Sequence, residues 1–223
     1  MTLGRRLAAE ALGTAFLLAT VIGSGIMGER LAGGNVAIAL LANALATGAA
    51  LVALIHAFGP VSGAHFNPAV TLVMAIRGEL SRCDACAYAA VQVVAAFAGV
   101  AGAHLMFGEP LFAESLKVRT GGAQWWSEVV ATFGLVAMIL GCLRSRADAV
   151  PYVVGLYITA AYWFTASTSF ANPAVTLARA TSPTFAGIRP LDAPLFIVAQ
   201  IAGALLAAVV MGWLLDEPSV RKS

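Results

Sequence analysis

Two asparagines stand out because each heads the same hexapeptide, NPAVTL, at residues 67–72 and 172–177. An asparagine side chain is a good N-cap, since its oxygen accepts a hydrogen bond from a free backbone N–H of the first helical turn. The proline that follows suits that turn, where its missing N–H is not needed. Asn67 and Asn172 are therefore expected to begin two helices whose N-terminal ends carry partial positive charge. The chemistry this favours is hydrogen bonding and electrostatic selection.

The helix after each asparagine is too short to cross a membrane. The apolar segments 68–77 and 173–180 have ten residues or fewer, and ten residues rise about 15 Å, half of a ~30 Å hydrocarbon core. The segments before them, 58–66 and 165–171, are expected to be non-helical at membrane depth. Such backbone persists there only when it is buried in protein or lines a wet cavity. Two re-entrant half-helices meeting near the midplane therefore predict a water-filled path.

The composition places both half-helices in an integral membrane protein. The chain of 223 residues is 60% hydrophobic and 11% charged, with a mean hydropathy of +0.87. Soluble domains carry about 25% charged residues. A net charge of +2, with no basic run or stacking aromatic pattern, argues against nucleic-acid binding.

Six apolar stretches approach the ~20 residues that a membrane-spanning helix needs. They are residues 7–27, 36–58, 85–107, 126–144, 150–169 and 193–215. Arg5 and Arg6 precede the first stretch, as in a signal peptide, but Glu10 lies inside it and no cleavage site stands out. We expect it to remain as a helix. The fifth stretch is the weakest of the six.

Lysine and arginine counts predict the orientation, because cytoplasmic loops carry the excess. With six crossings both termini share a side, and that side holds eight of these residues against five. The eight are Arg5, Arg6, Arg77, Arg82, Arg144, Arg146, Arg221 and Lys222. We therefore expect both termini in the cytoplasm, and the short termini favour a bacterial inner membrane.

The two halves of the chain match beyond NPAVTL. Glu10 and Thr14 open the first span as Glu128 and Thr132 open the fourth, and Gln92 in the third parallels Gln200 in the sixth. Each half therefore has three helices, so the second half enters from the opposite face and the repeats are inverted. We expect a first repeat at 1–107, an outer loop at 108–125 and a second repeat at 126–223.

With six spans, inverted repeats and two NPA motifs, the sequence resembles the aquaporin and aquaglyceroporin channels over about residues 7–215. The resemblance implies an all-α membrane protein with six transmembrane helices and two re-entrant half-helices, assembled as a homotetramer with one pore per subunit. It implies that the NPA motifs, Asn67-Pro68-Ala69 and Asn172-Pro173-Ala174, meet in the pore, where the asparagines donate N–H groups to the passing solute. Glu10 and Glu128 match positions that brace the re-entrant loops. Opposed helix N-termini also exclude protons and cations.

The chain departs from the family at the outer filter. Most members carry arginine directly after the second NPA, but here the position is Val175. Arg179 follows one turn later, about 5.4 Å along the axis, and is expected to be too far to replace it. By resemblance the remaining filter positions are Thr47, Ala160 and Ser169. These small residues predict a wide filter without a fixed charge.

Such a filter would pass neutral solutes larger than water, such as polyols, urea or metalloid hydroxides. It resembles a bacterial aquaglyceroporin subgroup, associated with arsenic resistance, that has valine at this position and passes arsenite and methylated arsenicals. Two alternatives stay open: a water-selective aquaporin, and a secondary transporter, which can also have inverted repeats. No acidic residue adjoins either NPA, which disfavours coupled transport. No nucleophile–base pair, metal cluster or phosphate loop suggests an enzyme or a cofactor.

The remaining polar residues have two interpretations each. His65 is expected to line the cytoplasmic side of the pore, or else only to bond backbone carbonyls in its loop. His56, near the cytoplasmic end of the second span, resembles a pore-facing position. Cys83 and Cys86 form a CxxC, and with Cys142 they make an odd count of three, which argues against a disulfide framework. We interpret this CxxC as ordinary packing, because a pore that conducts arsenite should not trap it on thiols.

Overall fold

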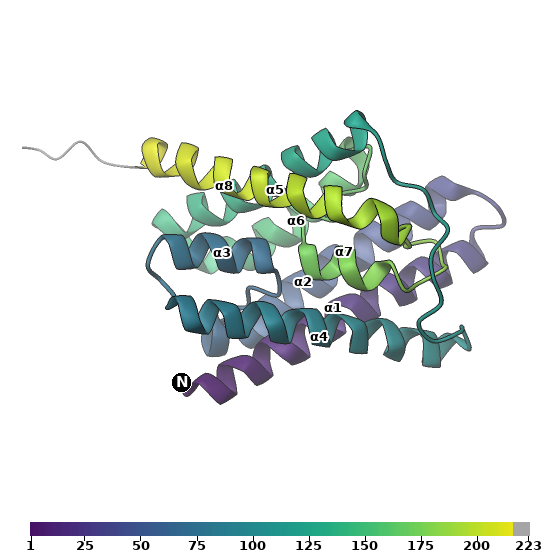
Figure 1. Ribbon diagram of the computed structural model, residues 1–223, viewed down its shortest axis with the longest axis horizontal. Coiled ribbons are helices and arrows are strands. Elements are labelled where there is room, and N and C mark those ends of the chain that lie inside the picture. The colour runs from purple at the N-terminus through teal and green to yellow at the C-terminus, as the bar shows by residue number, and fades with distance from the viewer. Residues whose placement is uncertain (216–223) are drawn as a thin grey trace, which may run out of the picture.

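The computed structural model describes residues 1–215 and is built from helices, with no strand in that range (Figure 1). The all-α class expected from the sequence is confirmed. The long helices are α1 (Leu3–Leu31), α2 (Val36–Ser62), α4 (Arg82–Phe107), α5 (Gly122–Ser145), α6 (Val150–Phe164) and α8 (Ala193–Leu215). The short ones are α3 (Pro68–Ile76) and α7 (Pro173–Arg179), with 3-10 turns η1 (Ala147–Ala149) and η2 (Pro190–Asp192).

The same packing pattern occurs in both halves. In the first half α1 packs against α2 and α4, and in the second half α5 packs against α6 and α8. Contacts between α2 and α6 join the halves. Each half-helix also reaches across, because α3 packs on α8 and α7 packs on α4. The two short helices are thereby fixed in the middle of the bundle (Figure 1).

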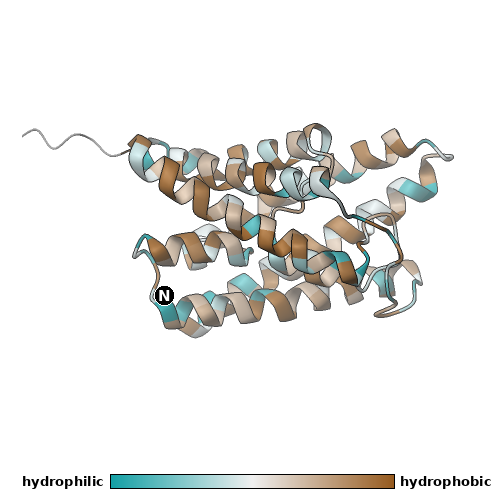
Figure 2. Cartoon of the chain, turned by 45° about the horizontal axis from the view of Figure 1, so that its top comes forward, coloured by the Kyte–Doolittle hydropathy of each residue, from teal (hydrophilic) through white to brown (hydrophobic). Residues whose placement is uncertain are grey.

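Five segments are long and apolar enough to cross a membrane: α1, α2, α4, α5 and Pro190–Leu215. Figure 2 shows their apolar residues along the helices. The stretch expected at 150–169 is helical only to Phe164, because Thr165 turns to an extended conformation and the chain enters the second re-entrant loop. Conversely, α2 continues through Pro60 to Ser62, and Gly63 ends it at a φ of 89°. The first non-helical segment is therefore shorter than the expected 58–66.

Glycines let the long helices cross at very short range. Gly48 of α2 and Gly155 of α6 face each other, and a Cβ on either would collide with the partner's backbone oxygen. A Cβ on Gly99 would meet the carbonyl of Ala15, and one on Gly203 would meet that of Val129. In both halves, therefore, a glycine allows close approach of two helices: α4 crosses α1 in the first half, and α8 crosses α5 in the second.

The N-terminus and the end of α8 lie at the same end of the molecule (Figures 1 and 2). The loop between α4 and α5 lies at the opposite end and is shorter than expected, since α5 begins at Gly122. Hydrogen bonds from Ser115 N to Ala180 O and from Arg189 N to Lys117 O fasten this loop to the α7–α8 connection. Arg221 and Lys222, which entered the charge count, and the end of the expected second repeat lie outside the described residues.

Candidate functional site

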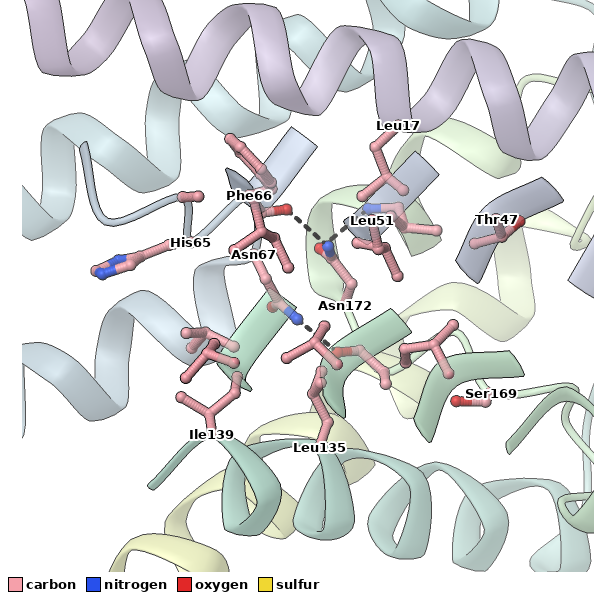
Figure 3. A pocket seen from close by; sticks show the side chains of 18 of the residues that line it. Leu17, Thr47, Leu51, His65, Phe66, Asn67, Leu135, Ile139, Ser169 and Asn172 are labelled. Atoms are coloured by element: carbon pink, nitrogen blue, oxygen red, sulfur yellow. Dashed lines mark hydrogen bonds between the residues drawn. The ribbon is translucent and has the colours of Figure 1, made fainter. Parts of the chain in front are cut away.

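A cavity of about 190 Å³ runs through the middle of the bundle. Both re-entrant loops line it, and so do the N-terminal ends of α3 and α7. Figure 3 shows Asn67 and Asn172 at its centre, His65 to one side, and Thr47 and Ser169 to the other. Half-helices from the two halves of the chain therefore meet inside one cavity.

The asparagines are held by reciprocal hydrogen bonds. Asn67 donates from Nδ2 to the carbonyl of Ala171 at 2.7 Å, and Asn172 donates to the carbonyl of Phe66 at 2.8 Å. Each Oδ1 caps its own half-helix, accepting from Ala69 N in one case and Ala174 N in the other. Since an amide NH₂ has two hydrogens, each asparagine retains one donor, and both side chains line the cavity.

The loops before the asparagines adopt a paired, strained backbone. Residues three and one before Asn67, Ala64 and Phe66, have φ values of 50° and 49°. The equivalent residues before Asn172, Ser169 and Ala171, both have 49°. Left-handed conformations cost an L-residue roughly 1–2 kcal/mol, so other contacts must hold these loops in place.

Glu10 and Glu128 supply those contacts from the buried faces of α1 and α5. Glu10 accepts hydrogen bonds from the backbone N–H groups of His65 and Phe66 at 3.0 and 2.7 Å. Glu128 accepts from Phe170 and Ala171, both at 2.9 Å.

A glutamine completes each of these clusters. Gln92 donates to Glu10 at 2.8 Å and to Thr71, and Gln200 donates to Glu128 at 2.6 Å and to Thr176. Each carboxylate thus ties a re-entrant loop to the long helix that follows it. A carboxylate committed to several fixed donors is poorly suited to carry protons.

Three of the four expected filter residues line the cavity: Thr47, Ser169 and Val175. Ala160 does not, because it lies on an exposed face of α6. The inner face of that helix carries Ile158 and Tyr162, four residues apart and therefore on one side. Tyr162 is the residue that the sequence analysis missed, and its hydroxyl lies 3.3 Å from that of Thr47. The spacing of apolar residues in α6 would have indicated Tyr162, whereas counting residues back from Asn172 gave Ala160.

Arg179 also lines the cavity, although the sequence analysis expected it to lie too far along the half-helix to replace the missing arginine. Long side chains on a helix point back toward its N-terminus, so the Arg179 guanidinium returns toward the filter loop. Its carbon lies 3.3 Å from the centre of the Phe170 ring. The side chain is 2% exposed and donates through Nε to the carbonyl of Ala186.

The two histidines occupy different environments. His65 lines the cavity, with Nδ1 3.1 Å from the hydroxyl of Thr71. His56 is exposed on α2, bonded to the Val52 carbonyl and packed against Tyr152, and does not line the cavity. His56 therefore lies on an exposed face of α2, away from the residues that line the cavity.

Much of the remaining cavity wall is apolar. The long helices contribute Leu17, Leu51, Leu135, Ile139, Val154 and Ile158. The asparagine amides and the re-entrant loops contribute hydrogen-bonding groups to the same cavity. Figure 3 shows the two asparagines between Leu17 and Leu51 on one side and Leu135 and Ile139 on the other.

Comparisons with known proteins agree with this geometry. The family described as "Major intrinsic protein" matches residues 1–169 and 143–222. Over 223 residues the chain is 58% identical to aquaglyceroporin AqpS of Rhizobium meliloti (strain 1021), covering 99% of this chain and 95% of that protein. It is 30% identical to aquaporin Z of Bradyrhizobium diazoefficiens, covering 96% and 95%.

The fold has a solved counterpart. The structure of the aquaglyceroporin from Plasmodium falciparum superposes with a TM-score of 0.75 at 20% identity, covering 96% of this chain and 99% of that one. With its paired half-helices, central asparagines and the cavity between them, the chain belongs to the major intrinsic protein family and is a passive membrane channel for small solutes.

Proposed function

We propose that this chain conducts neutral solutes larger than water, above all arsenite, methylated arsenicals and glycerol-like polyols. The observation that carries the proposal is Val175, which lines the cavity in the first turn of α7, at the position where the family resemblance implies an arginine. The 58% identical relative is named an aquaglyceroporin, which supports the same solute class.

The cavity suits such solutes chemically. A polyol or arsenous acid has several hydroxyls, which can accept the free N–H of Asn67 and Asn172 while its less polar side faces Leu51, Leu135 and Ile139. Arsenous acid is neutral at pH 7, so it does not meet the electrostatic penalty that the helix N-termini impose on cations. The ring of Tyr162 narrows one side of the filter more than the methyl group of the expected Ala160 would. We therefore propose that the channel conducts compact solutes.

Stopped-flow measurements on liposomes test the proposal. We expect wild-type protein to pass arsenite and glycerol, and Val175→Arg to reduce both fluxes by about tenfold or more while sparing water, because an arginine here narrows the filter. Conduction of water alone by both proteins would instead support a water-selective aquaporin.

Coupled transport is the rival from another class. A transporter needs free ionisable groups near the midplane, whereas Glu10 and Glu128 are each engaged by backbone and glutamine donors. We therefore propose passive flux, which an imposed pH or sodium gradient should leave unchanged in rate and end point.

We also propose a homotetramer in a bacterial inner membrane, with both termini cytoplasmic. Large apolar side chains lie exposed along the outer faces of the helices, among them Phe16, Leu45, Val94, Leu156 and Trp213. Lipid or neighbouring subunits must cover them. Native mass spectrometry of the detergent-released protein should give four copies, and a monomer under conditions that preserve other channels would count against this assembly.

A further inference from the structure

Two buried arginines hold one aromatic ring beside the outer filter. The Phe170 ring lies 3.3 Å from the guanidinium carbon of Arg179 and 4.9 Å from that of Arg119. Arg179 ends α7, whereas Arg119 belongs to the loop between α4 and α5. Two segments distant in sequence thus bring like charges to the same ring.

Neither guanidinium group forms an ion pair with an acidic side chain within residues 1–215, although the backbone N–H of Arg119 donates to Asp192 Oδ2 at 2.8 Å. Arg119 donates instead to the carbonyls of Gly187 and Ser167, at 2.9 and 3.0 Å, and Arg179 donates to the carbonyl of Ala186. A buried cation is costly unless it is paired or well solvated. Two unpaired cations at one place therefore require a reason, and carbonyl bonds and a ring face account for only part of their solvation.

The position of Arg179 supplies that reason. It lines the cavity together with Tyr162, Ser169 and Val175. The hydroxyl of Ser169 is buried without a hydrogen-bond partner among the described residues. The charge absent at Val175 is therefore present four residues later on the same half-helix, close to an unpaired hydroxyl.

The positive charge of the two arginines also affects the pKa of a lysine in the loop between α4 and α5. Burial lowers the pKa of Lys117 to about 8, and the charges of Arg119 and Arg179 act in the same direction. Burial also lowers the pKa of Arg119, to about 10, which leaves it charged at neutral pH. The outer end of the cavity is thus positive although Val175 is neutral.

We propose that Arg179, supported by Arg119, is the cation barrier of the outer filter, replacing from one turn further along α7 the charge that Val175 omits. This inference deepens the proposed function. Val175 leaves room for a polyol-sized solute, and Arg179 keeps the entrance closed to K⁺. Selection by size and selection by charge are thus divided between two residues of the same half-helix.

The first test compares K⁺ leak with glycerol flux in the same liposomes. Arg179→Met should raise the K⁺ leak on the order of tenfold, because a full charge near the ion path is removed, and should leave glycerol flux within about twofold. Adding Val175→Arg to Arg179→Met should restore K⁺ exclusion by returning the charge to the first turn. Arg30→Met, at an exposed site near the outer end, is the matched control and should not leak.

A second variant guards against loss of folding. Arg179→Lys keeps the charge but makes it titratable, and burial with Arg119 nearby should lower the pKa of the new lysine. Tyr162 and Glu128 are the other groups whose charges act at this position. The K⁺ leak of Arg179→Lys should therefore be higher at alkaline than at acidic pH, and should exceed the wild-type leak at alkaline pH because arginine keeps its charge more strongly than lysine.

The outcomes separate the two proposals. If Arg179→Met excluded K⁺ tightly, or if Arg179→Lys did so at every pH, Arg179 would not be the cation barrier. Exclusion would then be assigned to the N-terminal ends of the half-helices alone. Equal loss of glycerol flux and K⁺ exclusion in a folded Arg179→Met would make the arginine structural and also overturn it. If the wild type passed neither glycerol nor arsenite but Arg179→Met leaked K⁺, the proposed solutes would be wrong and the proposed role of Arg179 as a cation barrier would be supported.

Discussion

Single buried carboxylates set the geometry of the pore residues. Glu10 and Glu128 each bond two consecutive backbone N–H groups of a strained loop, and each bonds a glutamine from the following long helix. Hydrogen bonds to a charged group are stronger than neutral ones. These bonds offset the left-handed backbone before each asparagine, so the central donors are held ready for a solute.

Glu128→Gln should therefore destabilise the protein. The amide presents only one oxygen where the carboxylate presents two, and a buried N–H left without an acceptor costs about 1–3 kcal/mol. We expect a lower melting temperature in detergent and reduced solute flux. Glu114→Gln, at an exposed loop site, is the control, and equal melting of the two variants would contradict the bracing role.

Tyr162 and Ala160 allow the inner face of α6 to be tested directly. Tyr162→Ala should widen the filter and raise the flux of a five-carbon polyol relative to glycerol several-fold, since it removes a ring beside Thr47. Ala160→Leu should change neither flux, because that side chain faces outward. The reverse result in liposome swelling would return Ala160 to the filter.

At the scale of helices, glycines decide how closely the long elements approach. Gly99 of α4 contacts the backbone of α1 at Ala15, whereas Gly102 on the same helix has open space beside it. Close crossings also fix the half-helices, because α4 supports both α3 and α7. A shift of α4 would therefore be transmitted to the cavity.

Gly99→Val should destabilise the protein by roughly 1–3 kcal/mol, the usual cost of overpacking, and should lower the melting temperature in detergent. Gly102→Val is a control of the same size in the same helix and should melt like wild type. If both valines behaved alike, the α1–α4 crossing would not be as tight as the geometry indicates.

At the scale of the whole molecule, the inverted arrangement puts the N-terminus and the end of α8 on one side of the bundle (Figure 1). The native cysteines serve as markers, because Cys83 and Cys86 are exposed at the start of α4 and Cys142 lies near the end of α5. On the other side, Leu116 is 80% exposed in the loop between α4 and α5.

A membrane-impermeant thiol reagent should therefore label Cys83 and Cys86 only in permeabilised cells. In intact cells it should label a Leu116→Cys variant and not the wild type. This pattern follows from the excess of arginine and lysine expected on the cytoplasmic side. Labelling of native cysteines from outside would reverse the orientation.

The sequence alone determined the features that rest on local chemistry. Asparagine followed by proline favours a helix start through the cap and the fixed φ of the ring, so residue types alone located the two half-helices. The length of apolar stretches and the repeated glutamate and glutamine positions indicated the helical class and the paired halves. The ends of α2 and α6 differ from the expected ones, because loop geometry, and not composition, ends these helices.

Only the tertiary structure decided which side chains meet in the cavity. Ala160 and Tyr162 differ by two residues, which turns a side chain to the other face of a helix, and the path of the loop from α6 to Asn172 sets that rotation. His56 lies on another helix, α2, and there too the packing of the helix places the side chain on an exposed face. Arg179 seemed too distant when measured along the helix axis, yet its long side chain runs back toward the filter and meets a second arginine from a remote loop. The spacing of two residues in the sequence gives their distance along the helix axis. The position of the charged end of a long, flexible side chain depends on the groups that pack around it, which only the tertiary structure shows.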